Sequence, residues 1–240
     1  MYILRKIALF FFDILDLYFH QKRILKFFKK NIHKIDFFID VGAHNGTYTD
    51  LFIQHYKIKK VLMFEPQKKI FNFIKNKYKK KKNIECLNLA ISNNNNYKVL
   101  KLNLHDLTST FSSFSKNNYY LTFKAMLFGV KKKKMIYGIE KVKTVTLSKI
   151  LVKNYKNTNI DLVKIDTEGH EFEVLKGTGE KMKSIKCIII EFHLDSIFKK
   201  YNPNNIHKYL LKKNFVLSKI IRFPFTTWED RIYLNQNFFK

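Results

Sequence analysis

The sequence predicts an α/β fold, with a Rossmann-like, doubly wound and mainly parallel sheet and a helical appendage at the N-terminus. Two segments lead to this prediction. Residues 37–66 run from an apolar stretch through a glycine turn and a helical stretch into a second apolar stretch, which ends at Glu65. Residues 161–177 repeat the order of apolar stretch, acidic turn and helix. Strands that alternate with helices are typical of a parallel sheet covered on both faces.

The other elements continue this alternation, on the basis of apolar spacing and of polar or glycine turns between them. We expect helices over residues 47–56, 68–78, from 147–151 onward, from 172 to 183, and over 207–213. We expect strands over residues 37–39, 61–64, 84–89, 97–104, 142–147, 162–165, 187–192, 215–221 and 230–234.

The length of 240 residues suits one domain, and a hydrophobic fraction of 46% suffices for a sizeable core. We expect an N-terminal helical extension over residues 1–35 and the main domain over residues 36–240. Within it, residues 105–140 are the least regular part, first rich in Ser and Asn, then aromatic, then lysine-rich. A segment this long inside a compact domain is usually functional, so we expect a lid or a substrate-binding insert.

Residues 3–29 have helical apolar spacing, carried by Ile7, Phe10, Phe11, Ile14, Leu15, Leu17 and Tyr18. Asp13 and Asp16 interrupt the apolar stretch, which argues against a signal peptide, and no apolar run is long enough to span a bilayer. We expect this helix to pack on the domain of a cytoplasmic protein. Peripheral contact of residues 3–29 with a membrane is the alternative.

The glycine turn indicates the type of ligand. It contains Gly42 and Gly46 but no G-x-G-x-x-G pattern, and Asp40 stands directly before it. A carboxylate there would repel a pyrophosphate but attract an ammonium or sulfonium group, which favours S-adenosylmethionine over NAD. Glu65 follows Gly46 by nineteen positions, at the end of the next strand, where a carboxylate can bind the two ribose hydroxyls.

The second segment places acids at another strand end. Asp166 follows the apolar strand, and Glu168, His170, Glu171 and Glu173 come within the next seven positions. Ligands of open parallel sheets lie outside the carboxyl ends of the strands. A solvated turn would explain one or two of these acids, but not a carboxylate at the strand end in so basic a chain.

These two segments, with the sequence IIIEFH at residues 188–193, resemble the FkbM family of S-adenosylmethionine-dependent methyltransferases over about residues 36–195. The resemblance implies a fold of the class I methyltransferase type. It also implies that the glycine turn lines the methionine end of the cofactor, that Glu65 takes the ribose, and that residues 88–91 pass near the adenine. The predicted cofactor-binding residues are Asp40, Gly42, Ala43, His44, Asn45, Gly46, Glu65, Pro66, Asn88 and Ala90. Ser148 stands where the family commonly carries an acid, which leaves a role for that acid in doubt.

Residues 166–171 would then face the methyl group that is transferred. Methyl transfer needs in-line positioning of the acceptor and, for a hydroxyl, a base near its proton. Asp166 is the first candidate for this base, His193 the second and His170 the third. We expect Lys164, Glu168 and Glu191 to bind the substrate. The structural alternatives are a buried stem for Lys164 and helix capping for Glu168 and Glu171.

No metal is predicted. Asp166, Glu168, Glu191 and His193 are residue types that hold hard cations, but their spacing matches no metal motif. Cys86 and Cys187 lie in apolar runs and indicate buried free thiols in a reducing compartment.

The net charge of +27 raises the question of nucleic-acid binding. Only four residues are arginine, the side chain best suited to phosphate and base contacts, and Lys, Asn, Ile, Phe and Tyr share A/T-rich codons. Specific nucleic-acid binding is therefore not expected. The lysine runs at residues 79–82 and 131–134 could hold an acidic substrate.

The predicted function is methyl transfer from S-adenosylmethionine to a hydroxyl of a small-molecule or glycan acceptor, namely a sugar, a glycan precursor or a secondary metabolite. An RNA methyltransferase is the first alternative, because of the charge. A non-catalytic membrane-peripheral protein is the second, and a NAD-dependent oxidoreductase comes last because its glycine pattern is absent. The sequence predicts neither the acceptor itself nor the oligomeric state.

Overall fold

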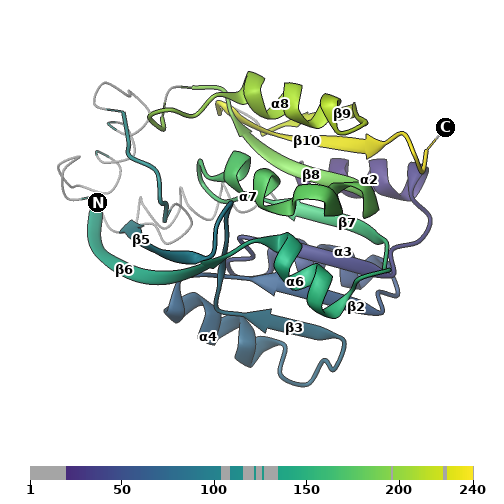
Figure 1. The fold of residues 1–240 in the computed structure, drawn as a ribbon, viewed down its shortest axis with the longest axis horizontal. Helices are drawn as coiled ribbons and strands as arrows, with labels where there is room; N and C mark the ends of the chain where they lie inside the picture. Colours follow the sequence, from purple (N-terminus) through teal and green to yellow (C-terminus); the bar gives the residue numbers. More distant parts are fainter. Residues whose placement is uncertain are drawn as a thin grey trace.

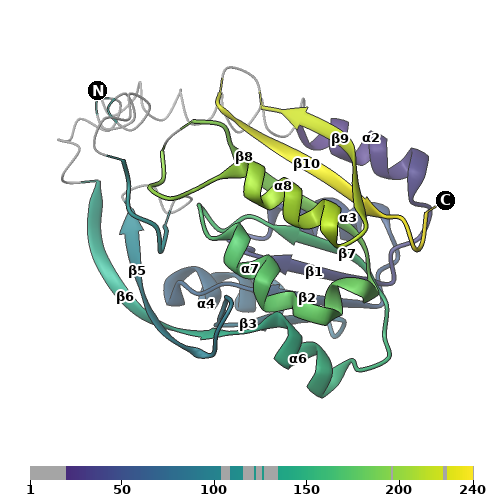
Figure 2. The ribbon, with the colours of Figure 1, turned by 45° about the horizontal axis from the view of Figure 1, so that its top comes forward.

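A seven-stranded sheet forms the centre of the computed structural model, which describes residues 20–103, 109–115, 122, 126, 135–195, 197–223 and 226–239. The strand order is β3-β2-β1-β7-β8-β10-β9 (Figure 1 and Figure 2). The strands span Phe37–Val41 (β1), Lys60–Phe64 (β2), Ile84–Leu87 (β3), Ile160–Ile165 (β7), Ile185–His193 (β8), Phe215–Arg222 (β9) and Trp228–Asn235 (β10).

The first five strands in this order are parallel, and β10 runs antiparallel to both of its neighbours, β8 and β9. This confirms the predicted α/β fold with a mainly parallel sheet. The register of β1 and β7 sets Asp40 opposite Lys164 across two neighbouring strands. That pairing brings a base and an acid together at the carboxyl end of the sheet.

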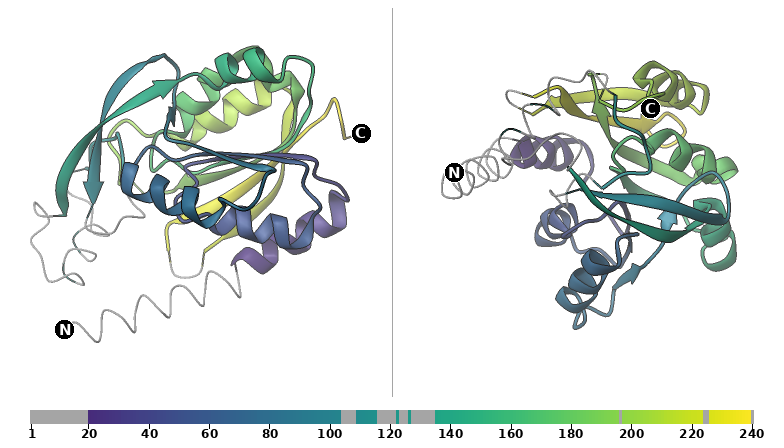
Figure 3. Two further views of the ribbon diagram at one scale, coloured as in Figure 1. Left: turned by 90° about the horizontal axis from the view of Figure 1, so that it is seen from below. Right: turned by 90° about the vertical axis from the view of Figure 1, so that its left-hand side faces the viewer.

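Helices cover both faces of the sheet, as the right-hand view of Figure 3 shows. On one face, α2 (Lys22–Asn31), α3 (Thr47–His55) and α4 (Lys68–Lys77) contribute Phe28, Phe52 and Ile74 to a buried cluster. On the other, α6 (Leu147–Asn154), α7 (Glu171–Thr178) and α8 (Pro203–Lys212) pack with alternate residues of the same strands. The sheet is therefore buried on both sides, which is why its strands are almost continuously apolar.

A smaller sheet stands beside the carboxyl ends of the parallel strands (Figure 2). Its strand order is β4-β6-β5, with β4 at Ala90–Ile91, β5 at Asn96–Asn103 and β6 at Ile136–Val145. The long strands β5 and β6 pair antiparallel and form a two-stranded ribbon. We predicted one strand over residues 84–89. The chain instead leaves the central sheet after Leu87, and β4 pairs with β6.

Two further element boundaries differ from the predictions. The helix expected to reach residue 183 ends at Thr178, and a 3₁₀ helix follows at Gly179–Ser184. The change occurs where Gly179 adopts a φ of 54°, which an α-helix cannot accommodate. Strand β6 begins at Ile136, inside the insert that we expected over residues 105–140.

The described part of that insert lies against the turn before α7. Thr110 pairs with Lys101 in an isolated bridge, and its hydroxyl donates to the Glu168 carbonyl. The Ser112 hydroxyl donates to the Gly169 carbonyl at 2.8 Å. Thr110 and Ser112 of the insert thus contact the acidic turn, and the role of the insert as a lid or substrate-binding element stays a prediction.

The N-terminal helical extension is described from residue 20 onward, so the apolar positions from Ile7 to Tyr18 lie outside the described residues. Within the described part, Ile24, Leu25 and Phe28 of α2 are buried against the central sheet, and the Phe28 and Phe52 ring centroids are 4.9 Å apart. A search of the described helices finds none with the length and apolarity to cross a membrane.

Candidate active site

The glycine turn after β1 fits tightly against the end of β7. Gly42 has a φ of 77°, and a Cβ atom there would lie 1.8 Å from the Asp166 carbonyl oxygen. Gly46 has a φ of 82° at the start of α3, and its Cβ would lie 2.3 Å from the Tyr78 hydroxyl. Neither position tolerates a side chain. The turn therefore forms one wall of a site whose other wall is the acidic turn after β7.

Glu65 lies directly after β2 and faces the same site. Its Oε2 accepts a hydrogen bond from the His44 amide at 2.9 Å, and its Oε1 accepts one from the Gln67 amide at 2.8 Å. Burial raises the pKa of Glu65 to about 7, although the two amides act in the opposite direction. A carboxylate has about four lone-pair sites, so two remain for the hydroxyls of a ligand.

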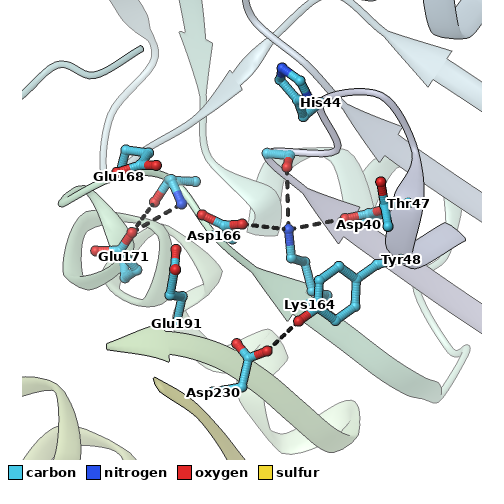
Figure 4. A network of polar contacts seen from close by, with 12 residues as sticks. Asp40, His44, Thr47, Tyr48, Lys164, Asp166, Glu168, Glu171, Glu191 and Asp230 are labelled. Carbon is cyan, nitrogen blue, oxygen red and sulfur yellow. Dashed lines mark hydrogen bonds and ion pairs between the residues drawn. The ribbon is translucent and has the colours of Figure 1, made fainter. Parts of the chain in front are cut away.

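Lys164 holds the two walls together (Figure 4). Its Nζ donates to Asp166 Oδ2 at 3.0 Å and to the Gly42 carbonyl at 3.4 Å, and it lies 3.9 Å from Asp40 Oδ1. The side chain is only 4% exposed. Burial alone would lower the pKa of Lys164, but the charges of Asp166 and Asp40 raise it above its ordinary value. The lysine is therefore a buried cation between two acids.

Aromatic and acidic groups complete the surroundings of this lysine. The Nζ of Lys164 lies 4.7 Å from the Tyr48 ring centroid, and the Tyr48 hydroxyl donates to Asp230 on β10 (Figure 4). Asp230 also accepts a hydrogen bond from the His20 ring, with 2.8 Å between Nε2 and Oδ2. The network therefore reaches from β1 to β10.

Asp40 lies behind the glycine turn. Its carboxylate is fully buried and accepts a hydrogen bond from the Thr49 hydroxyl at 2.8 Å, and burial raises its pKa. We expected Asp40 to follow the strand, but β1 continues to Val41. The alternation of the strand then directs Asp40 towards α3. A direct contact between Asp40 and the cofactor stays a prediction.

Asp166 lies directly after β7, where Lys164 donates a hydrogen bond to it. Burial would raise the pKa of Asp166, but Lys164 and a hydrogen bond with Glu191 keep it below its ordinary value. The pKa of Glu191 is raised well above its ordinary value by burial and by the charge of Asp166. The two pKa shifts run in opposite directions, so a proton at this pair favours Glu191 over Asp166.

Asp166, Glu168 and Glu191 each offer a carboxylate oxygen, and the three oxygens lie within 4.8 Å of one another. This is the donor set that we considered for a metal ion from the sequence. The absence of a metal stays our prediction.

The two candidate histidines differ in their surroundings. His170 is neutral, because burial and the charges of Lys98 and Lys176 lower its pKa to about 3. Its Nε2 lies 3.0 Å from the Ser92 hydroxyl. His193 Nε2 lies 3.8 Å from a carboxylate oxygen of Glu168 and 3.8 Å from one of Glu191. His193 is thus the histidine next to the acids.

Glu171 stabilises the acidic turn before α7 through hydrogen bonds. Its Oε1 accepts hydrogen bonds from the Thr167 amide at 3.0 Å, the Thr167 hydroxyl at 3.1 Å and the Gly169 amide at 3.0 Å. The side chain is fully buried, and burial raises its pKa to about 7. Glu171 therefore caps the turn before α7, which agrees with the structural alternative considered from the sequence.

A pocket opens between these walls, and half of the predicted site residues line it. They are Gly42, His44, Glu65, Pro66, Ala90, Asp166, Glu168 and His170. The other predicted residues surround the pocket without forming its lining, namely Asp40, Ala43, Asn45, Gly46, Asn88, Lys164, Glu191 and His193. Asn88 supports the lining, because its Nδ2 donates to the Glu65 and Pro66 carbonyls at 2.9 and 2.8 Å.

Sequence reasoning missed several residues of the pocket wall, namely Gln67, Leu100, Ser109 and Phe111. Ser109 and Phe111 belong to the insert, whose length was the signal that could have included them. Leu100 comes from β5, and no sequence pattern indicated that this strand folds over the end of the central sheet.

The sequence profile of the methyltransferase FkbM domain matches residues 40–217. The crystal structure of the methyltransferase FkbM from Methylobacillus flagellatus superposes with a TM-score of 0.56 and 14% identity, over 83% of this chain and 43% of that chain. The chain thus spans less than half of that protein. TrmK from M. capricolum, solved with S-adenosyl-homocysteine, superposes with a TM-score of 0.49 and 13% identity, over 89% of this chain and 67% of that chain. The putative methyltransferase YhhF from Escherichia coli superposes with a TM-score of 0.47 and 9% identity, over 90% of this chain and 84% of that chain. No curated protein matches the sequence.

Proposed function

Because the chain belongs to the FkbM methyltransferase family, we propose that it transfers a methyl group from S-adenosylmethionine to a hydroxyl of a sugar, a glycan precursor or a secondary metabolite. The observation that supports this most is the position of Asp166, hydrogen-bonded to Lys164, in the wall of a pocket that also contains Glu65. A carboxylate for a ribose and a carboxylate for a hydroxyl proton are the two groups that the reaction needs from the protein.

The residues of the pocket fit S-adenosylmethionine. Glu65 retains free lone pairs for the ribose hydroxyls, and Leu89, Ala90 and Ile91 offer an apolar surface for the adenine ring. The bare backbone at Gly42 allows the amino-acid end to approach closely. The sulfonium of the bound cofactor supplies a methyl group that is already activated.

Asp166 is the proposed base. With the cofactor bound, a carboxylate oxygen of Asp166 would accept the hydroxyl proton while the methyl carbon passes from sulfur to the acceptor oxygen, which would leave S-adenosyl-homocysteine as a neutral thioether. Lys164 favours the ionised form of Asp166 before the reaction. Glu168 and His170 line the same pocket and are proposed to contact the acceptor.

Cofactor binding is tested by titration calorimetry with S-adenosyl-homocysteine and with NAD. We expect S-adenosyl-homocysteine to bind much more tightly than NAD. Glu65→Ala should weaken its binding by about 1.5–3 kcal/mol, the usual range for hydrogen bonds to a charged group. A preference for NAD, or an unchanged affinity in the variant, would overturn the cofactor assignment.

The role of Asp166 is tested by methyl transfer from labelled cofactor to a panel of sugars and polyhydroxylated acceptors. Asp166→Asn keeps the shape and removes the charge, so S-adenosyl-homocysteine should still bind while turnover falls about 10²–10⁴-fold. His193→Ala is the comparison and should lose less. Normal turnover in Asp166→Asn together with an inactive His193→Ala would transfer the role of base to the histidine.

A further inference from the structure

The ribbon formed by β5 and β6 has an outer face with an unusual composition. Alternate residues of the two strands point outward, and four of them are large and apolar. The exposed fractions are 56% for Tyr97, 51% for Val99, 51% for Tyr137 and 70% for Ile139. An antiparallel sheet usually carries polar residues on its solvent face. A patch of this kind indicates an interaction surface.

The inner face of the same ribbon already has a structural role. Leu100 and Val142 point inward, are buried, and form a small core with Ala90. Leu100 also lines the pocket of the candidate active site. The core and the pocket are therefore complete without the outer residues, and the folding of the ribbon does not explain why those residues are apolar.

Lysines accompany the apolar side chains on the outer face. Lys143 pairs across the ribbon with Tyr97, and Lys141 pairs with Val99. Both lysines are exposed, and the Nζ of Lys141 lies 5.1 Å from the Tyr97 ring centroid. Glu140 on β6 and Glu85, which lines the adjoining hollow, each have a partner. Glu140 accepts the Lys68 amide, and Glu85 pairs with Lys60.

The lysine-bearing surface continues beyond the ribbon. Lys143 also lines a hollow between α6 and β3, with an apolar floor that includes Leu87, Val145 and Ile150. Lys149 and Lys153 stand on the rim of this hollow. The whole surface thus presents tyrosines and aliphatic side chains surrounded by four lysines.

We propose that this surface, the outer face of the β5–β6 ribbon with the adjoining lysine rim, docks on an anionic lipid bilayer. Tyrosine and aliphatic side chains partition into the headgroup region, and lysines extend their charged ends towards anionic headgroups. The charge of the surface is complementary to that partner. The inference concerns a different surface from residues 3–29 and does not depend on the proposed function.

Single-stranded RNA is the competing anionic partner, and the side chains favour it less. RNA platforms rely on aromatic rings that stack on bases and on arginine. Val99 and Ile139 offer no ring, the basic residues of this surface are all lysine, and Lys141 lies over the Tyr97 ring. The most exposed side chain of the face, Ile139, gains most from an apolar environment.

The test is flotation of the full chain with vesicles of phosphatidylcholine mixed with phosphatidylglycerol, compared with vesicles of phosphatidylcholine alone. We expect binding to the mixed vesicles. Lys141→Gln with Lys143→Gln should weaken it on the order of 30-fold, the effect of two lysines near an anionic surface. Val99→Ser with Ile139→Ser should weaken it as well, because the apolar contact is lost.

The matched control removes the same charge elsewhere. Lys212→Gln with Lys219→Gln changes two exposed lysines on α8 and β9 and should leave vesicle binding close to that of the parent. Thermal melting and the affinity for S-adenosyl-homocysteine should be unchanged in all three double variants, which shows that each of them folds.

Three results would overturn the proposal. The first is vesicle binding that survives in both ribbon variants. The second is an equal loss in the control pair, which would mean that net charge alone attracts the protein. The third concerns the variant with Lys141→Gln and Lys143→Gln. It would bind vesicles as the parent does but would no longer bind a single-stranded uridine oligomer, measured by fluorescence anisotropy. That last result would make RNA the partner of this surface.

Discussion

Two lysines of this protein, Lys164 in the central sheet and Lys141 on the β5–β6 ribbon, share their local chemistry and differ in their surroundings. Each lies on a strand, and each holds its Nζ over a tyrosine ring, at 4.7 Å from Tyr48 and 5.1 Å from Tyr97. Lys164 is 3% exposed and lies beside two carboxylates, whereas Lys141 is exposed. The contact with an aromatic ring is therefore common to both, and burial with Asp40 and Asp166 is what distinguishes Lys164.

This difference matters in a chain with 46 lysines and arginines. A/T-rich codons are a sufficient reason for many exposed lysines, but they do not explain a buried one. Among the lysines that the structure describes, Lys164 is the one that is buried. Burial, rather than abundance, therefore identifies the lysine on which the site depends.

The largest expected effect is that of Lys164→Met. The variant leaves the buried Asp40 and the partly exposed Asp166 without their cation, so the free energy of unfolding should fall by about 3–5 kcal/mol in urea denaturation. The two carboxylates can relieve this by taking up protons, so the loss should shrink as the pH falls from about 8 to about 5. A loss of the same size at both pH values would assign it to the packing of the lysine stem instead.

A smaller effect on the free energy of unfolding is expected for Glu171, an acid whose side chain is buried. Burial raises the pKa of Glu171 from 4.5 to about 7. Since the folded pKa exceeds the unfolded one, this group stabilises the fold below about pH 4.5, and that contribution is lost as the pH rises through about 7. Glu171→Gln keeps the Oε1 acceptor for Thr167 and Gly169 and removes the titration.

Urea denaturation at several pH values should therefore show Glu171→Gln equal to the parent in acid and more stable than the parent above neutrality. Glu173→Gln is the control, because Glu173 lies on the same helix, is partly exposed and pairs with Lys176 at 3.3 Å. The control should show no such gain. If Glu171→Gln is destabilising at every pH, the charge itself is needed to hold the turn.

The smallest effect is expected for Lys141→Met. An exposed substitution without a buried partner usually changes the free energy of unfolding by less than about 0.5 kcal/mol. The same urea denaturation that measures Lys164→Met measures this variant. A loss comparable to that of Lys164→Met would remove the distinction between the two lysines.

The sequence was sufficient to predict the parallel sheet and the positions of Glu65 and Asp166, because each acid follows a short apolar run. It placed the end of β1 two residues too early, and because successive residues of a strand point to opposite faces, Asp40 is directed towards α3. The pairing of Asp40 with Lys164 depends on the register of strands more than a hundred residues apart. No local pattern encodes that register.

That β5 and β6 form a separate ribbon was not predicted, for a related reason. Strands β5 and β6 were both expected, but which sheet they join depends on β4, a strand of two residues that pairs with β6. So short an element has no periodicity to detect. The contribution of Leu100 to the pocket follows from that pairing and could not be predicted without it.

The position of β10 has a consequence for the synthesis of this protein. Strand β10 follows β9 in the chain but lies between β8 and β9 in the sheet. While the ribosome is still adding the residues before β10, β8 has no partner on that side, and β9 has no strand on which to pair. The unpaired edge of the sheet is then β8, with the sequence IKCIIIEFH, and an unpaired apolar edge strand is prone to pair with another chain. We therefore expect chains that stall before residue 228 to be the ones that aggregate, and the Asp230 partner of Tyr48 to reach the site only when the sheet closes.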